Sequence, residues 1–80
     1  MTRPELMARL QTVFDNVFID KVVLTPVLTA HDVPEWDSLM QVSLIVAIEG
    51  AFSIRFRVGE VEATKCVGDL ADLIAKRVAT

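Results

Sequence analysis

Apolar residues recur at intervals of three and four in the first part of the chain, which predicts an amphipathic helix. The stripe consists of Leu6, Met7, Leu10, Val13, Phe14, Val17 and Phe18. Thr2 and Glu5 fit a capping box at its start, because a threonine hydroxyl can accept from a free amide and a glutamate can reach back. We therefore expect a helix from about Arg3 to Phe18.

A second helix is expected from Ser38 to about Ala51. The apolar residues that cover most of its circumference are Leu39, Met40, Val42, Leu44, Ile45, Val46, Ala47 and Ile48. Such a helix is either central to the core or exposes a face that binds something. The spacing of Ser38 and Gln41 matches a capping box with Ser38 as the N-cap. Glu49-Gly50 predicts the end of the helix, because glycine is favoured just beyond one.

The last helix is expected from about Val67 to Val78. Its apolar stripe consists of Val67, Leu70, Ala71, Leu73, Ile74 and Val78. Acids lie early in it and bases late, which suits the helix dipole. Glu60 to Ala63 could form one short helical turn. The pattern as a whole predicts an all-α protein: a small antiparallel four-helix bundle of three main helices and one short helix, in a single domain over residues 1–80.

The segment from Ile19 to Asp37 lacks helical periodicity, and Pro26 and Pro34 oppose both a long helix and a central strand. We expect an extended loop here. A structureless loop of this length is unusual in so small a domain unless it is functional. Residues 52–58 alternate between apolar and polar as a strand does, but no partner strand is predicted, so an extended connector is expected there.

Charge and composition narrow the classes of function. Eleven acidic and eight basic residues give a formal net charge of −3, which argues against a nucleic-acid partner. The longest apolar run, Leu44 to Ile48, is too short to span a membrane. Glu5 lies where a signal peptide needs an apolar core, so a cytoplasmic location is expected. The protein is also expected to be a monomer. With one cysteine, Cys66, and one histidine, the sequence holds no recognisable metal-ligand set.

Ser38 is the main candidate for chemistry. A phosphate attached to its hydroxyl at the start of a helix would be favoured by the free amides and by the helix dipole. The simpler reading is that Ser38 only caps the helix. A hydrolase would need His31 as base and Asp32 as orienting group, but any short chain offers such trios. We therefore expect no catalytic residues and no enzyme activity.

The neighbourhood of Ser38 resembles a known family. Trp36 and Asp37-Ser38-Leu39, then an apolar helix, Phe52 and a late Val67-Gly68-Asp69-Leu70, look like an acyl carrier protein. The resemblance covers nearly the whole chain. It implies that Ser38, flanked by Asp37 and Leu39, carries 4'-phosphopantetheine from coenzyme A. A phosphopantetheinyl transferase would attach this arm, and its thiol would hold acyl groups as thioesters for acyl-loading, acyl-transferring or condensing enzymes.

The same resemblance implies docking and pocket residues. Partners would dock on Trp36, Met40, Gln41, Ser43 and Glu49. An acyl chain would be sheltered by Val46, Ile54, Val61, Ala63 and Leu73, although for each of them the sequence favours ordinary core. Trp36 could likewise serve only to pack the loop onto the bundle.

The second helix departs from the family pattern at places where many members carry acids. Met40, Ser43 and Gly50 occupy these places and only Glu49 remains acidic. Electrostatic docking on this helix should therefore be weaker and apolar docking stronger. This favours a specialised pathway, such as polyketide, peptide or unusual-lipid synthesis, over housekeeping fatty-acid synthesis. A peptidyl or aminoacyl carrier, and an unmodified helical interaction module with this fold, remain alternatives.

Overall fold

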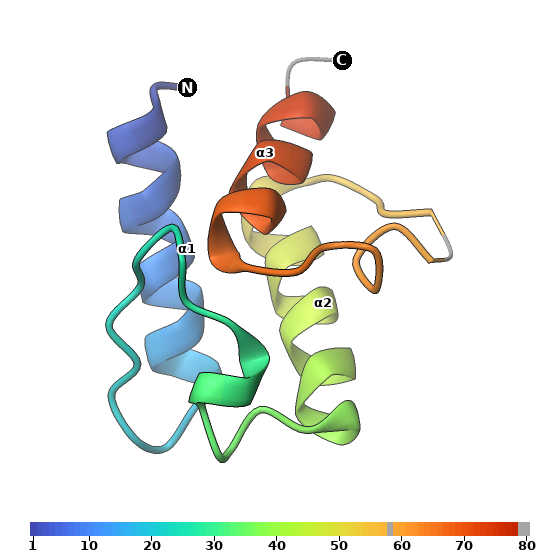
Figure 1. Ribbon diagram of the computed structural model, residues 1–80. Helices are drawn as coiled ribbons and strands as arrows, with labels where there is room; N and C mark the ends of the chain where they lie inside the picture. Colours follow the sequence, from blue (N-terminus) through green and yellow to red (C-terminus); the bar gives the residue numbers. More distant parts are fainter. Residues whose placement is uncertain (58, 79–80) are drawn as a thin grey trace.

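The computed structural model describes residues 1–57 and 59–78. Three α-helices, α1 (Arg3–Val17), α2 (Ser38–Phe52) and α3 (Val67–Val78), are joined by long connections (Figure 1). The described part of the chain contains no β-strand, which confirms the all-α prediction. The predicted bounds of the first and last helices agree with the structure to within one residue.

The direction of the helices corrects the expected antiparallel bundle. Helix α1 packs against both α2 and α3. It runs antiparallel to α2, but α2 and α3 run in the same general direction (Figure 1). The reason is the connection between α2 and α3, whose described residues 53–57 and 59–66 carry the chain back along the domain (Figure 1).

The core lies between the three helices and is closed by the two connections. Its buried side chains are Leu6, Leu10, Val13, Phe14, Phe18, Val22, Leu44, Ile48, Phe52, Val61, Val67, Leu70, Ala71 and Ile74. Most belong to the apolar stripes predicted for the first and last helices. Burial of these side chains removes apolar surface from water and is the main force that holds the helices together. Within α2, only Leu44, Ile48 and Phe52 are buried, so this helix faces the core along one side only.

The bounds of α2 agree with the prediction to within one residue, but the residues that cap it differ. The N-cap is Asp37, whose carboxylate accepts the Met40 amide at 2.8 Å, and Ser38 is the first helical residue. A carboxylate at this position is a charged acceptor next to the positive end of the helix dipole, and it outcompetes the hydroxyl. At the other end, the helix continues through Gly50 to Phe52, and Ser53 terminates it in the left-handed conformation with φ 54°.

The short fourth helix expected at Glu60 to Ala63 is only a single turn. Residues 60–63 form a turn, closed by a 3.2 Å hydrogen bond from the Ala63 amide to the Gly59 carbonyl. The only additional helical segment in the described residues is a 3₁₀ turn, η1 (Ala30–Asp32), inside the first loop. The Asp32 carboxylate stabilises it by accepting the Thr29 amide at 3.0 Å.

The loop between α1 and α2 is ordered without forming a strand, as expected for an extended segment. Gln11 of α1 donates to the Val22 carbonyl at 2.7 Å and accepts the Leu24 amide at 3.0 Å. The Glu35 carboxylate accepts the amides of Ile19 and Asp20 at 3.0 and 3.1 Å. Side chains thus provide the hydrogen bonds that a neighbouring strand would otherwise supply.

The tip of this loop is fixed to the start of α3. The Gly68 amide donates to the Pro26 carbonyl at 2.8 Å, and the Val67 amide donates to the Leu28 carbonyl at the same distance. A Cβ atom on Gly68 would lie 2.9 Å from the Pro26 oxygen. Glycine in the first turn of α3 therefore permits the close approach of two segments.

Candidate functional site

Ser38 is exposed at the start of α2, where the long first loop ends. Because Asp37 caps the helix, the Ser38 side chain is not needed for that purpose. Within residues 1–57 and 59–78, the Ser38 hydroxyl has no hydrogen-bond partner. The first-turn amides of Ser38 and Leu39 have no preceding helical carbonyl to bond, so they add partial positive charge beside the hydroxyl.

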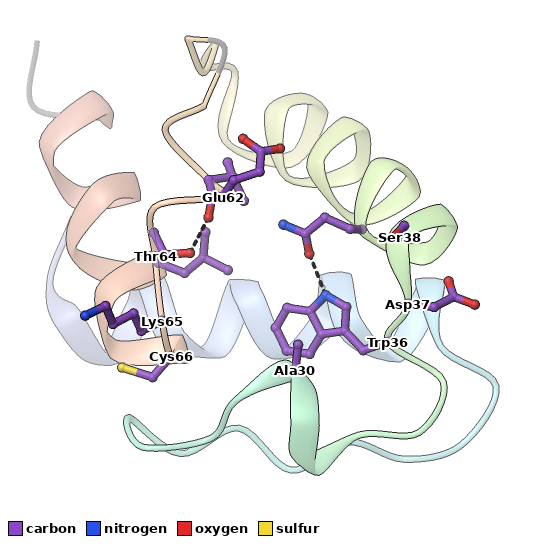
Figure 2. A pocket seen from close by; sticks show the side chains of 11 residues that line it. Ala30, Trp36, Asp37, Ser38, Glu62, Thr64, Lys65 and Cys66 are labelled. Atoms are coloured by element: carbon purple, nitrogen blue, oxygen red, sulfur yellow. Dashed lines mark hydrogen bonds between the residues drawn. The ribbon is translucent and has the colours of Figure 1, made fainter.

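A hollow of about 390 Å³ opens beside Ser38, between the two long connections and the starts of α2 and α3 (Figure 2). It is lined by Ala30, Trp36, Asp37, Ser38, Gln41, Val61, Glu62, Thr64, Lys65, Cys66 and Leu70. The lining combines buried apolar side chains with polar groups at the rim. Lys65 is the one cationic residue in this lining, and its side chain points away from Ser38 (Figure 2).

Trp36 forms one wall of the hollow and also anchors the loop. Its ring meets those of Phe14 and Phe18 edge to face, with centroid distances of 5.3 and 5.9 Å. Its Nε1 donates to Gln41 Oε1 at 2.5 Å (Figure 2). Trp36 therefore packs the loop onto α1 and links it to the first turn of α2. Its predicted role in docking stays a prediction, as does that of Gln41.

In the second connection, sequence reasoning predicted Val61 as a pocket residue but did not find Thr64 or Lys65. Thr64 and Lys65 lie next to one another on this segment, far from Ser38 in sequence. The Thr64 hydroxyl donates to the Val61 carbonyl at 2.6 Å, and the Lys65 amide donates to Asp69 at 3.1 Å. The first bond closes a turn within the connection, and the second fixes the segment to α3. A weak signal was available, because these residues directly precede the last predicted helix.

The residues of the hydrolase hypothesis are not brought together with Ser38. His31 is exposed in η1 and does not line the hollow beside Ser38. The Asp32 carboxylate bonds to the amide and hydroxyl of Thr29 rather than to the imidazole. Among the described residues, no group of three or more His, Cys, Asp or Glu side chains could hold a metal ion.

The other predicted docking residues occupy different sides of α2. Ser43 is exposed, whereas Met40 is half-buried against the core. Leu39, which was predicted to flank the attachment site, is exposed as well. Glu49 is half-buried, and its carboxylate accepts the Phe56 amide at 2.9 Å. Val42, which the docking prediction did not include, is exposed beside Leu39.

The five predicted pocket residues are spread over the domain. Val46 and Ile54 line one shallow depression, while Val61 is buried at the hollow beside Ser38. Ala63 is exposed and Leu73 is half-buried against the core. An acyl pocket made by all five stays a prediction, since no described cavity contains more than two of them.

Comparison with known proteins gives this geometry a context. The family model for the phosphopantetheine attachment site matches residues 36–74. The solution NMR structure of holo acyl carrier protein from Geobacter metallireducens is 42% identical in sequence, with a TM-score of 0.76. The alignment covers 98% of this chain and 86% of that one. The chain belongs to the acyl carrier protein family. No curated protein sequence gives a significant match.

As a member of this family, the carrier uses covalently attached phosphopantetheine as its prosthetic group. The site fits such a group: an exposed hydroxyl without a partner lies at a helix start, beside a hollow lined in part by Trp36 and Val61. In the part of the carrier that the structure describes, no helix is long and apolar enough to cross a bilayer.

Proposed function

We propose that Ser38 is the attachment point of the 4'-phosphopantetheine arm and that the carrier delivers acyl groups bound to it as thioesters. The observation that supports this most directly is the free Ser38 hydroxyl at the start of α2, inside the segment that matches the attachment-site family. Asp37 and Leu39 flank it in the order that carrier proteins of the family use.

Three features of the chain suit this role. Asp37 provides the helix cap, so the Ser38 hydroxyl can exchange its proton for a phosphodiester bond while the helix keeps its start. The free first-turn amides of α2 offset part of the negative charge of the phosphodiester. The hollow beside Ser38 offers apolar surface from Trp36 and Val61, next to which the arm can lie. The attached arm supplies the thiol that forms the thioester.

The partners of the proposed carrier are a phosphopantetheinyl transferase and the enzymes that load, transfer or condense acyl groups. The outward side of α2 consists of Leu39, Val42, Ser43, Val46 and Gly50, and none of these exposed residues is charged. This surface supports the preference for partners with apolar contacts. We therefore propose a specialised pathway, such as polyketide or unusual-lipid synthesis, over fatty-acid synthesis, with no reaction catalysed by the chain itself.

Intact-mass measurement tests the attachment site. The purified carrier is incubated with coenzyme A and a broad-specificity phosphopantetheinyl transferase, next to a known carrier as positive control. A gain of one phosphopantetheine that is absent from Ser38→Ala is the expected result. Failure of several transferases to modify the protein, under conditions that modify the control, would instead favour an unmodified interaction module.

Loading assays separate the acyl carrier from an aminoacyl or peptidyl carrier. The modified protein is offered acyl and aminoacyl groups by the corresponding loading enzymes, and thioesters are detected by mass before and after hydroxylamine treatment. Acyl loading with little aminoacyl loading is expected. The opposite preference would assign the chain to the peptidyl carriers.

A further inference from the structure

The first loop of the carrier concentrates negative charge at one end of the molecule. Residues 15–37 contain five acids and one lysine, a net charge of −4 with histidine neutral. The remaining residues hold six acids and seven bases, a net charge of +1. The acids of residues 15–37 are Asp15, Asp20, Asp32, Glu35 and Asp37. The whole excess of negative charge thus lies in the segment that leads to Ser38.

Helix α1 adds to this negative potential. Its C-terminus points into the loop, and its last turn contains Asp15 but no basic residue. The C-terminal end of a helix carries a partial negative charge from its free carbonyl groups. Lys21 bonds to the Asp15 carboxylate at 3.0 Å and offsets one of the charges. Within the described residues, Asp20 is exposed and its carboxylate has no partner.

The same loop contains a hollow with an apolar floor. Its volume is about 540 Å³. The lining residues are Asp20, Lys21, Val22, Val23, Leu28, Asp32, Val33, Pro34 and Glu35. An apolar floor with acids at the rim suits an apolar side chain that is flanked by lysine or arginine.

The walls of this loop hollow are fixed before any partner arrives. Glu35 ties the wall around Asp20 to the segment before α2, and Asp32 ties the 3₁₀ turn to Thr29. Gln11 holds the extended floor at Val22 and Leu24. A preformed hollow of this kind loses little conformational entropy when it is filled.

Helix α2 offers no comparable electrostatic surface. Its exposed apolar residues Leu39, Val42 and Val46 have exposed fractions of 79%, 59% and 63%. The one acid of α2, Glu49, is half-buried and bonded to the Phe56 amide. A basic partner that approaches Ser38 is therefore attracted by the loop rather than by the helix.

We propose that the loop hollow is the electrostatic docking site for the phosphopantetheinyl transferase, which inserts an apolar side chain flanked by basic residues. This inference rests on the proposed function of Ser38. Glu35 lies three residues before Ser38, at most about 10 Å along an extended chain. An enzyme that brings coenzyme A to Ser38 can therefore contact the hollow at the same time. Negative charge on this surface raises the rate at which a transferase with basic residues encounters the carrier, and salt screens this attraction.

A pair of charge variants tests the electrostatic part. Asp20→Lys reverses a charge at the rim of the hollow, and Asp72→Lys makes the same change on α3, where Asp72 bonds to Arg3 near the other end of α1. The measurement is kcat/KM for modification by coenzyme A and a broad-specificity phosphopantetheinyl transferase, followed by intact mass. Asp20→Lys is expected to lower kcat/KM about fivefold at low salt, because KM rises. At about 0.5 M salt this difference from the unaltered carrier should disappear. Asp72→Lys should change it less than twofold.

A second pair tests the apolar floor. Val23→Ser removes an apolar side chain that lines the hollow, and Val27→Ser removes one of similar exposure outside it. Val23→Ser is expected to lower kcat/KM about threefold at both salt concentrations, because apolar contacts are not screened. Val27→Ser should have no effect. Circular dichroism of all four variants establishes that the fold is kept.

The outcomes separate this inference from the proposed function. If the unaltered carrier is modified but Asp20→Lys and Asp72→Lys have equal effects, the docking site is wrong and the attachment role stands. If the unaltered carrier is never modified, both the docking site and the attachment role of Ser38 are wrong. Amide chemical shifts of the carrier on titration with transferase, without coenzyme A, give an independent readout. Changes at Asp20, Val23 and Val33 are expected, and changes confined to α2 would overturn the proposal.

Discussion

The Asp37 carboxylate accepts the Met40 amide at 2.8 Å and thereby caps α2 one residue before Ser38. From the sequence, Ser38 was expected both to cap the helix and to provide the reactive hydroxyl. In the structure these two roles belong to different residues. Asp37 stabilises the helix start, and Ser38 keeps a hydroxyl that is free to react. Loss of the cap should affect stability, whereas loss of the hydroxyl should affect only modification.

Asp37→Ala is expected to lower the free energy of unfolding by about 1 kcal/mol, the usual cost of removing an N-cap. Ser38→Ala is the matched variant, because its hydroxyl bonds to nothing in the described chain. It should change stability by less than about 0.5 kcal/mol. Urea denaturation of both variants measures the difference. Equal destabilisation by the two substitutions would show that Ser38 shares the capping role.

Two glycines in helices should respond in opposite ways to alanine. Gly50 lies within α2 with nothing near the position of a Cβ atom, so Gly50→Ala should stabilise the carrier by about 0.5–1 kcal/mol through helix propensity. At Gly68, a Cβ atom would lie 2.9 Å from the Pro26 oxygen. Gly68→Ala must displace that loop and weaken the 2.8 Å hydrogen bond from the Gly68 amide.

Gly68→Ala is therefore expected to destabilise the carrier by about 1–2 kcal/mol, in spite of alanine's better helix propensity. Thermal unfolding of both variants against the unaltered protein provides the measurement. An increase in stability for Gly68→Ala would mean that the contact with Pro26 is loose.

The sequence predicted those features of the fold that depend on local pattern. The apolar stripes located α1 and α3 nearly to the residue, and the prolines correctly excluded a long helix from the first loop. Local rules failed where two neighbouring residues compete for one task. Asp37 and Ser38 can both cap a helix, and Gly50 can end one or lie within it. Charge and packing decided these cases, and neither is visible in spacing alone.

The central residue of the candidate site could be predicted from the sequence, but several residues around it could not. Ser38 could be selected because a helix start and a family resemblance coincide there. Lys65 and Thr64 reach the same hollow only because the second connection folds back toward α2. The acidic excess of residues 15–37 can be counted in the sequence. The apolar hollow between those acids exists only after Gln11 and Glu35 have tied the loop to itself.

Acid should weaken the fold partly through Glu60. The pKa of Glu60 is lowered, first by the hydrogen bond from the Arg57 amide at 2.6 Å and also by the Arg77 guanidinium. A carboxyl with a lower pKa in the folded state binds fewer protons than in the unfolded state. Its contribution to stability is therefore complete above the ordinary glutamate pKa of about 4.3 and is lost as pH falls through the folded value.

Glu60→Gln is expected to reduce stability near pH 7 and to flatten the loss of stability between about pH 5 and pH 3. Glu62→Gln alters the net charge equally but removes neither of these bonds, so it is the control. Urea denaturation over this pH range measures both variants. Identical pH profiles for Glu60→Gln and the unaltered protein would exclude a role for Glu60 in acid sensitivity.

Trp36 should report the attachment of the arm. It is the only tryptophan in the chain, it is half-buried, and it lines the hollow beside Ser38. An arm that lies in this hollow displaces water from the indole, so fluorescence emission should shift to shorter wavelength after modification. Ser38→Ala, treated with the same coenzyme A and transferase, should show no shift. If intact mass proves complete modification while the emission of Trp36 stays unchanged, the arm does not occupy the hollow and extends into solvent instead.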